Sequence, residues 1–353
     1  MNTSDHSLAP SAEYRTTAGV DDTPSEGVFE VEVVDISLAV SPTASAADVH
    51  SVATTLLNSF TQTGFAVVTG HGINESAFAD MCTTSTEFFA LPREEKMSVG
   101  FPAPEIIRGY EPVPEAAEGA RTFNAMESFL INRIDPVDDF ATDTGQGRLW
   151  RWPNLWPERP EDMRQVWETY YRAMDALGAR LLELIADAYD LPQNTFTAMF
   201  DRHFSNLAYN NYPPRDAVAH DDIIPNGTHT DHGALTLLYR PSEPGGLEVY
   251  AQGHWWVVPW IENSLVLNVG DVLEFWTGGR LTATPHRVTW SSGANAGAGR
   301  QSVVFFQQPN PDAPLTPVPG LAATQTPSTA NTSAGMHISR KELGQHTLDA
   351  LGV

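Results

Sequence analysis

The segment His229-Thr-Asp-His-Gly-Ala-Leu-Thr-Leu-Leu-Tyr239 joins a pair of potential metal ligands to a run that favours a β-strand. Residues i and i+2 of an extended segment project to the same side, so His229 and Asp231 can present two ligands to one ion. The apolar run from Ala234 to Tyr239 follows at once, and a strand there would hold the pair rigidly. The segment therefore predicts a metal site supported by a β-sheet.

Similar short apolar runs, separated by Gly, Pro and Asn, lie on both sides of this segment. They cover residues 207–212, 234–239, 247–250, 255–258, 264–269, 286–290 and 301–307. Such regular spacing is typical of an antiparallel sandwich or barrel. Residues 291–299 are predicted to be a hairpin connection, and residues 309–332, which are rich in Pro and Thr, an irregular stretch.

The chain before these runs is mostly helical in character. Apolar side chains three or four residues apart predict an amphipathic helix over residues 45–63. Further helices are predicted over residues 75–90, briefly after Leu91-Pro92, and over about 161–189, with strands over 28–36 and 65–69. The longest helix is expected behind the sheet, because one of its faces carries Val166, Tyr170, Met174, Leu177, Leu181 and Leu184.

Helices followed by strands, with no evident linker between them, favour one α+β domain over two. Residues 1–27 are rich in Ser, Thr, Asp and Pro and are predicted to be a disordered tail. Residues 28–353 are predicted to be a single domain, with a helix-rich part (28–204), a β core (205–310) and a C-terminal extension (311–353). The end of this extension, residues 336–353, is expected either to fold over the mouth of the core as a lid or to dock as a terminal helix.

The charge balance restricts the possible partners. With 20 basic and 44 acidic residues the formal charge is −24, which repels phosphate backbones and anionic lipid surfaces and makes nucleic acid or membrane partners poor candidates. No signal-like start or long apolar run is found, so a cytoplasmic location is expected. Because Cys82 is the only cysteine, a bound metal would have to take nitrogen and oxygen ligands.

A third ligand must come from elsewhere in the chain. His286 is the best placed of the downstream histidines, because Thr284-Pro285 precedes it and a predicted strand follows. The other candidates are His232, His254, His337 and His346. A second pair, His220-Asp221-Asp222, lies in a predicted loop and is set aside. Two imidazoles and one carboxylate suit non-haem iron, but a His-x-Asp pair is short and single histidines are often structural, so both interpretations stay open.

Arg300-Gln-Ser302 points to an anion site. A guanidinium and a hydroxyl on one face of a strand can bind a carboxylate through charge-assisted hydrogen bonds. An unpaired arginine inside a barrel would be costly, which favours an anionic ligand. The alternative is an edge strand with Arg300 in water.

Taken in order, these motifs resemble the isopenicillin N synthase-like family of iron(II)- and 2-oxoglutarate-dependent oxygenases over roughly residues 33–309. The C-terminal half carries His229-Thr-Asp231, Asn268-Val-Gly-Asp271, the segment around His286 and Arg300-x-Ser302. Upstream, Asn210-Asn-Tyr212-Pro213 is similar to the Asn-Tyr-Tyr-Pro signature of the family and departs from it at Asn211. The N-terminal half matches through Gly64-Phe65, His71-Gly72-Ile73, the run from Phe88 to Lys96, and Arg108-Gly109-Tyr110.

The resemblance implies a double-stranded β-helix (jelly roll) flanked by helices, with iron(II), 2-oxoglutarate and dioxygen as cofactor and co-substrates. It assigns His229, Asp231 and His286 to the iron. It also implies that the distal carboxylate of 2-oxoglutarate meets Arg300 and Ser302, in a pocket lined by Tyr212 and Asn210.

The reaction implied is oxidation of a C–H bond of a small-molecule substrate, by hydroxylation, desaturation or ring formation, plausibly in specialised metabolism. Positions resembling those that face the substrate in the family are Arg108, Tyr110, Glu127, Phe129 and Phe306, each of which could instead be a core or surface residue. Arg-x-Ser also occurs in members that do not use 2-oxoglutarate, so an oxidase of the same fold is the first alternative. A non-catalytic binding protein is the second, and the sequence carries no signal for an oligomeric state.

Overall fold

The computed structural model describes residues 31–113, 126–214, 225–242, 246–290, 299–321 and 332–353. In these residues the strands form a larger and a smaller sheet. The larger sheet runs, in spatial order, through β1 (Val33–Asp35), β2 (Phe65–Thr69), β10 (Leu265–Val269), β7 (Leu235–Tyr239), β12 (Arg300–Gln307), β5 (Asn206–Tyr212), β4 (Glu127–Ile131) and β3 (Gly109–Glu111). The smaller runs through β6 (Asn226–His229), β11 (His286–Val288), β8 (Leu247–Ala251) and β9 (His254–Val257).

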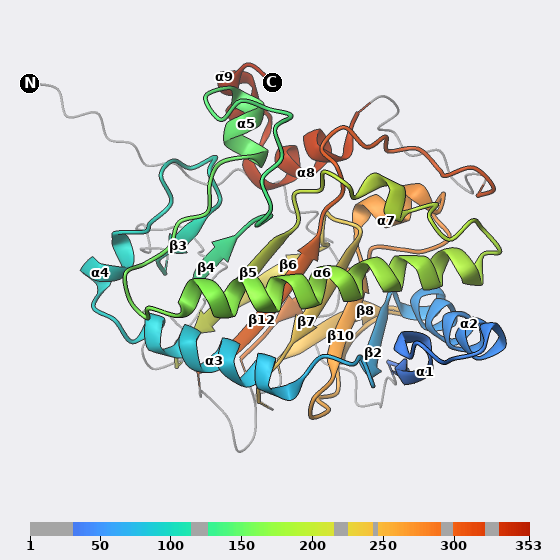
Figure 1. The fold of residues 1–353 in the computed structure, drawn as a ribbon. Helices are drawn as coiled ribbons and strands as arrows, with labels where there is room; N and C mark the ends of the chain where they lie inside the picture. The colour runs from blue at the N-terminus through green and yellow to red at the C-terminus, as the bar shows by residue number, and fades with distance from the viewer. Residues whose placement is uncertain (1–30, 114–125, 215–224, 243–245, 291–298, 322–331) are drawn as a thin grey trace, which may run out of the picture.

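Helices cover the larger sheet and gather at one of its ends. The helical elements are α1 (Ser37–Val40), α2 (Ala46–Thr63), α3 (Glu75–Phe89), α4 (Arg93–Met97), α5 (Gly145–Trp150), α6 (Met163–Ala188), the 3-10 turn η1 (Thr197–Met199), α7 (Asp271–Trp276), α8 (Ala334–Leu343) and α9 (Gln345–Leu351). The long helix α6 crosses the face of the larger sheet, with α2 and α3 packed along it (Figure 1). Helices α5, α8 and α9 lie together beyond one end of the strands (Figure 1). None of the helices described is both long and apolar enough to cross a bilayer.

The predicted helices form for the reasons that the sequence suggests. Helix α2 begins with a capping box, in which Asp48 N donates to Ser45 Oγ (3.2 Å) and Ser45 N donates to Asp48 Oδ2 (3.3 Å). It ends at Gly64, which adopts a left-handed conformation (φ 73°) that few other residues tolerate. The buried face of α6 includes Tyr170, Met174, Leu177, Leu181 and Leu184, as expected for a helix packed behind the sheet.

All seven predicted strands of the C-terminal half are present, with ends shifted by up to two residues. The strand predicted over residues 28–36 is observed at Val33–Asp35, and residues 28–30 are not among those described, like most of the predicted hairpin at 291–299. One hydrophobic cluster includes side chains from Val34 to Leu348. The single domain over residues 28–353 stays a prediction.

Several short elements were not anticipated. β3, β6 and α7 are three to six residues long, too short to show a clear period, and β4 lies in a stretch without alternation. The chain end forms the two helices α8 and α9, so of the two expected arrangements it adopts helical docking. The indole of Trp150 in α5 donates to Ser339 Oγ in α8 (3.1 Å) and helps to fix this docking.

Candidate functional site

The three predicted metal ligands converge where the strands β6 and β11 pair. His229, the last residue of β6, lies opposite His286, the first residue of β11. Asp231 Oδ1 lies 3.6 Å from Nε2 of His229 and 3.7 Å from Nε2 of His286. The ligand atoms of all three residues lie within 4.8 Å of one another, a separation that one bound ion can span. Two imidazoles and one carboxylate on one side of an ion leave its other side open, the arrangement that suits iron(II).

Backbone carbonyls orient both imidazole rings. Nδ1 of His229 lies 2.7 Å from the carbonyl oxygen of Gly227, and Nδ1 of His286 lies 3.1 Å from that of Thr284. When Nδ1 donates its proton to a carbonyl, Nε2 is left with a lone pair for the metal. Each carbonyl belongs to the residue two positions before its histidine, a relation that becomes visible only in the folded backbone.

The carboxylate of Asp231 is held through its other oxygen. Oδ2 accepts hydrogen bonds from Thr236 Oγ1 (2.5 Å) and Asn268 Nδ2 (2.7 Å), which leaves Oδ1 facing the two histidines. Burial alone would raise the pKa of Asp231, but the nearby His286 and His229 and the two hydrogen bonds together hold this pKa below its usual value. Asn268 thus has a role as an orienting residue for the carboxylate.

His286 is kept neutral by its surroundings. Burial, followed by the neighbouring His229, lowers the pKa of His286 to about 4, so the ring carries no proton on Nε2 at neutral pH. The turn before it packs closely on Gly64, where a Cβ would lie 2.2 Å from Thr284 Oγ1. That hydroxyl donates to the carbonyl of Thr63 (2.8 Å), so the end of α2 fixes the segment that carries His286.

Arg300 is the first residue of β12, which is an inner strand of the larger sheet. Its strand β12 is paired on both sides, by β7 and β5, so the alternative of an edge strand with Arg300 in water is wrong. Arg300 is 5% exposed, and its Nε and Nη1 have no hydrogen-bond partner among the described residues. Its guanidinium carbon lies 4.9 Å from the centre of the Tyr212 ring, and the two residues face each other across the strands. A buried cation with unpaired donors fits a carboxylate ligand.

One cavity contains both the triad and the arginine. Its polar lining includes all three predicted metal ligands and the four predicted co-substrate residues Asn210, Tyr212, Arg300 and Ser302. Its apolar lining includes Leu238, Leu247, Val304 and Phe306. A dicarboxylate can therefore reach from the metal ligands to Arg300 along a mostly apolar wall.

The residues predicted to face the substrate are dispersed. Only Phe306 lines this cavity, and Phe129 is fully buried in the main core. Tyr110 and Glu127 belong to a separate polar cluster, in which Glu127 Oε2 accepts from the Tyr110 hydroxyl (2.6 Å) and from Lys96 Nζ (2.7 Å). Arg108 lines a second cavity, treated below. The pair His220-Asp221 lies outside the described residues.

A polar chain that the sequence did not suggest links the metal ligands to the C-terminal helix. Thr230, between His229 and Asp231, donates through Oγ1 to Asp271 Oδ1 (3.1 Å). Nε2 of His337 in α8 lies 3.1 Å from Asp271 Oδ2. The sequence marks Asp271 only as the end of the Asn268-Val-Gly-Asp271 motif, and nothing local pairs it with His337, 66 residues away.

Comparisons with known proteins agree with this geometry. Residues 31–159 match the family described as non-haem dioxygenase in morphine synthesis, N-terminal, and residues 203–309 match the 2OG-Fe(II) oxygenase superfamily. The proline hydroxylase buaE of Petromyces alliaceus is 32% identical over 275 residues, covering 73% of this chain and 81% of that protein. The 2-oxoglutarate-dependent dioxygenase thnC of Trichoderma harzianum is 30% identical over 269 residues, covering 75% and 81%.

Solved structures show the same architecture. A putative 2OG-Fe(II) oxygenase family protein from Caulobacter crescentus superposes with a TM-score of 0.75 at 26% identity, covering 90% of this chain and 98% of that one. A full-length protein from Neurospora crassa, solved in complex with alpha-KG, gives a TM-score of 0.76 at 24% identity, covering 90% and 95%. The predicted α+β jelly-roll fold with flanking helices is confirmed.

Proposed function

The chain belongs to the 2OG-Fe(II) oxygenase superfamily, and on this premise we propose that His229, Asp231 and His286 hold its catalytic iron. The protein is a non-haem iron(II) dioxygenase that uses 2-oxoglutarate and dioxygen to oxidise a small molecule. Arg300 and Ser302 bind the distal carboxylate of 2-oxoglutarate, and Tyr212 and Asn210 shape the wall around it. The relatives named as 2-oxoglutarate-dependent dioxygenases favour this function over an oxidase that needs no 2-oxoglutarate and over a non-catalytic binding protein.

The buried guanidinium of Arg300 is the single observation that carries the co-substrate proposal. It lies in the same cavity as the metal ligands, and two of its N–H groups find no partner within the described part of the chain. An uncompensated buried charge is costly, and a carboxylate compensates it with short, strong hydrogen bonds. Ser302, on the same face of β12, adds a hydroxyl donor beside it.

Iron and 2-oxoglutarate, when bound, supply a reaction in which dioxygen and 2-oxoglutarate become succinate and carbon dioxide while one oxygen atom enters a C–H bond of the substrate. The chain itself contributes geometry and exclusion of water. Asp231 and the two histidines occupy one side of the metal site, held by Thr236, Asn268 and two backbone carbonyls. Leu238, Val304 and Phe306 keep the cavity wall apolar, which limits access of water to the reacting groups.

Phe306 and Arg108 are the two predicted substrate residues that we assign to the substrate. Tyr110 and Glu127 instead form a polar cluster with Lys96, and Phe129 packs in the hydrophobic core of the protein. Relatives are named as a proline hydroxylase and a validamycin A dioxygenase, so we propose a small metabolite as the substrate. The net charge of −24 makes nucleic acid an unsuitable partner.

Anaerobic binding measurements test this function. Protein purified without oxygen is mixed with iron(II) and then with 2-oxoglutarate, and the visible charge-transfer absorption of the complex is titrated. We expect saturable absorption in the wild type. A protein that takes up oxygen with its substrate but shows no such absorption and forms no succinate from labelled 2-oxoglutarate would instead be the oxidase.

A further inference from the structure

A second cavity lies between the barrel strands and the C-terminal helix. It is smaller than the first cavity. Its walls come from the segment before β3, from α5, from the start of β5 and from α8. The ends of α5 and α8 lie close together beyond the end of the larger sheet (Figure 1).

Polar groups of both kinds lack partners around this cavity. Arg108 is 1% exposed and donates from Nη1 to the carbonyl of Leu149 (3.2 Å), while its Nε and Nη2 have no partner among the described residues. The side-chain oxygens of Asn132 and Asn206 are likewise buried without a partner in that part of the chain. Burial lowers the pKa of Arg108 to about 9, a sign that its charge is poorly compensated. Unpaired donors and acceptors in one place call for a ligand that offers both.

The second cavity continues the first along the same face of the same strands. Phe306 of β12 lines the first cavity, and its cross-strand partner Asn206 of β5 lines the second. Gln308 also lines the second cavity and lies two residues after Phe306, so its side chain projects to the same side. A ligand in the second cavity therefore lies next to the Phe306 wall of the first cavity.

An arginine and a glutamate line this cavity without a hydrogen bond between them. Glu342 of α8 lines it and forms its hydrogen bond with Gln308. Burial raises the pKa of Glu342 to about 7, against the attraction of Arg108, so this carboxyl carries only part of its charge at neutral pH unless a cation binds beside it. Because the two groups remain apart, a ligand can place a negative group against Arg108 and a positive group against Glu342.

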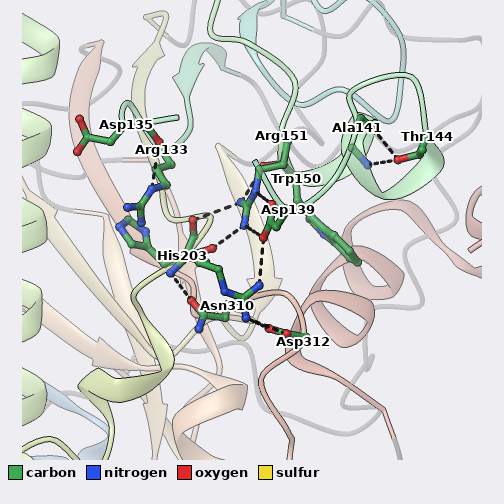
Figure 2. Close-up of polar contacts among 12 residues, drawn as sticks. Arg133, Asp135, Asp139, Ala141, Thr144, Trp150, Arg151, His203, Asn310 and Asp312 are labelled. Carbon is green, nitrogen blue, oxygen red and sulfur yellow. Dashed lines mark hydrogen bonds and ion pairs between the residues drawn. The ribbon is translucent and has the colours of Figure 1, made fainter. Parts of the chain in front are cut away.

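Salt bridges lie behind the walls of the second cavity, and none of their residues belongs to the metal site. Trp150, which lines the cavity, points away from the neighbouring Arg151, whose guanidinium faces Asp139 (Figure 2). Arg151 donates to both oxygens of Asp139 (2.6 and 2.8 Å), a bidentate pair. Arg202 joins Asp139 (3.2 Å) to Asp312 (2.9 Å), so the segment before α5 is tied to the end of the barrel. These pairs fix the segment that carries Trp150.

We infer that this second cavity is the substrate site and that it takes a small zwitterion, a free α-amino acid, with its carboxylate on Arg108 and its ammonium group towards Glu342. The inference rests on the proposed function, since it names the substrate class of that site. The oxygens of Asn132 and Asn206 accept hydrogen bonds from the same ligand, and the target C–H bond lies on the side of Phe306.

Calorimetry on the anaerobic complex with iron(II) and 2-oxoglutarate tests the inference. The proteinogenic L-amino acids are titrated one by one, and the tightest binder is compared with its amide and its N-acetyl derivative. We expect at least one amino acid to bind, and each derivative to bind at least about tenfold more weakly, because each loses a charge-assisted contact. Glu342→Gln is expected to weaken binding of the parent amino acid by a similar factor. The affinity for the N-acetyl derivative should stay unchanged.

Glu87→Gln, an exposed position on α3, serves as the matched control and should bind like the wild type. Arg108→Met should abolish binding, and if it does not fold, Glu342→Gln and the derivatives still decide. Absence of binding by any amino acid, or equal binding of the amide, overturns the inference. The visible absorption of the same sample separates the two proposals: absorption without amino-acid binding leaves the proposed function standing, and no absorption removes the proposed function together with this inference.

Discussion

The cavity around His229 and the cavity around Arg108 lie along the same strands but are assembled in different ways. In the first, the ligands sit on strands or beside them, and each is oriented by a group within five residues or on a paired strand. In the second, the walls come from a loop, a short helix, a barrel strand and the chain end. The difference indicates that local strand geometry fixes the shared oxidative chemistry, whereas tertiary assembly sets the substrate.

Removing a ligand from the first cavity should have the largest effect. Asp231→Ala takes away the carboxylate and leaves Asn268 and Thr236 facing an empty position. We expect iron affinity to fall more than about 100-fold, since even partners outside the ligand set typically matter by 10–100-fold. Iron content after desalting measures this. His254→Ala, an exposed histidine on β9, is the control, and equal iron retention in both variants would contradict the assignment.

Arg300→Met separates the co-substrate from the metal. The change removes the buried cation but no metal ligand, so iron affinity should stay within about twofold. The dissociation constant of 2-oxoglutarate should rise by about tenfold or more, because charge-assisted hydrogen bonds are lost. Titration of the visible absorption at fixed iron gives both values, and unchanged 2-oxoglutarate affinity would argue against Arg300 as its anchor.

His337→Ala tests whether the chain end supports the metal site. The variant breaks the contact from α8 to Asp271 and leaves Thr230 bonded to Asp271. Because His337 acts through two intermediates, we expect iron affinity to fall by about tenfold or less, near the lower end for orienting groups. His337→Asn, which can still donate a hydrogen bond, should recover part of the loss. If Ala and Asn behave alike in iron titrations, the chain from α8 is structural only.

Ser45→Ala should affect neither cavity. It removes the cap of α2, and we expect a loss of about 0.5–2 kcal/mol in the free energy of unfolding. Iron and 2-oxoglutarate affinities should be unchanged in the folded protein. Denaturant melts and the absorption titration check this, and a shift in iron affinity would mean that the end of α2 transmits strain to Thr284.

The sequence alone predicted more of the first cavity than of the second. The period-2 and period-3.6 patterns located α2, α3, α6 and the seven later strands, because each of these elements buries one continuous apolar face. The His-x-Asp spacing brought His229 and Asp231 together for the same local reason. β3, β6 and α7 were missed because three to six residues carry too little periodic signal.

The spacing of residues along the sequence does not predict the second cavity. Arg108, Asn206 and Glu342 are far apart in the chain, and each taken alone resembles an ordinary core or surface residue. The unpaired polar atoms of Arg108 and Asn206 become evident only when the folded chain shows which atoms lack partners among the described residues. The same holds for Asp271 and His337, whose contact depends on where α8 docks.

Iron-edge anomalous diffraction from anaerobic crystals grown with iron(II) and 2-oxoglutarate tests the central claim most directly. We predict one strong peak bounded by Nε2 of His229, Nε2 of His286 and Oδ1 of Asp231, with the far carboxylate of 2-oxoglutarate against the guanidinium of Arg300. A peak elsewhere, or a His286 ring turned away from an iron ion, would contradict the account.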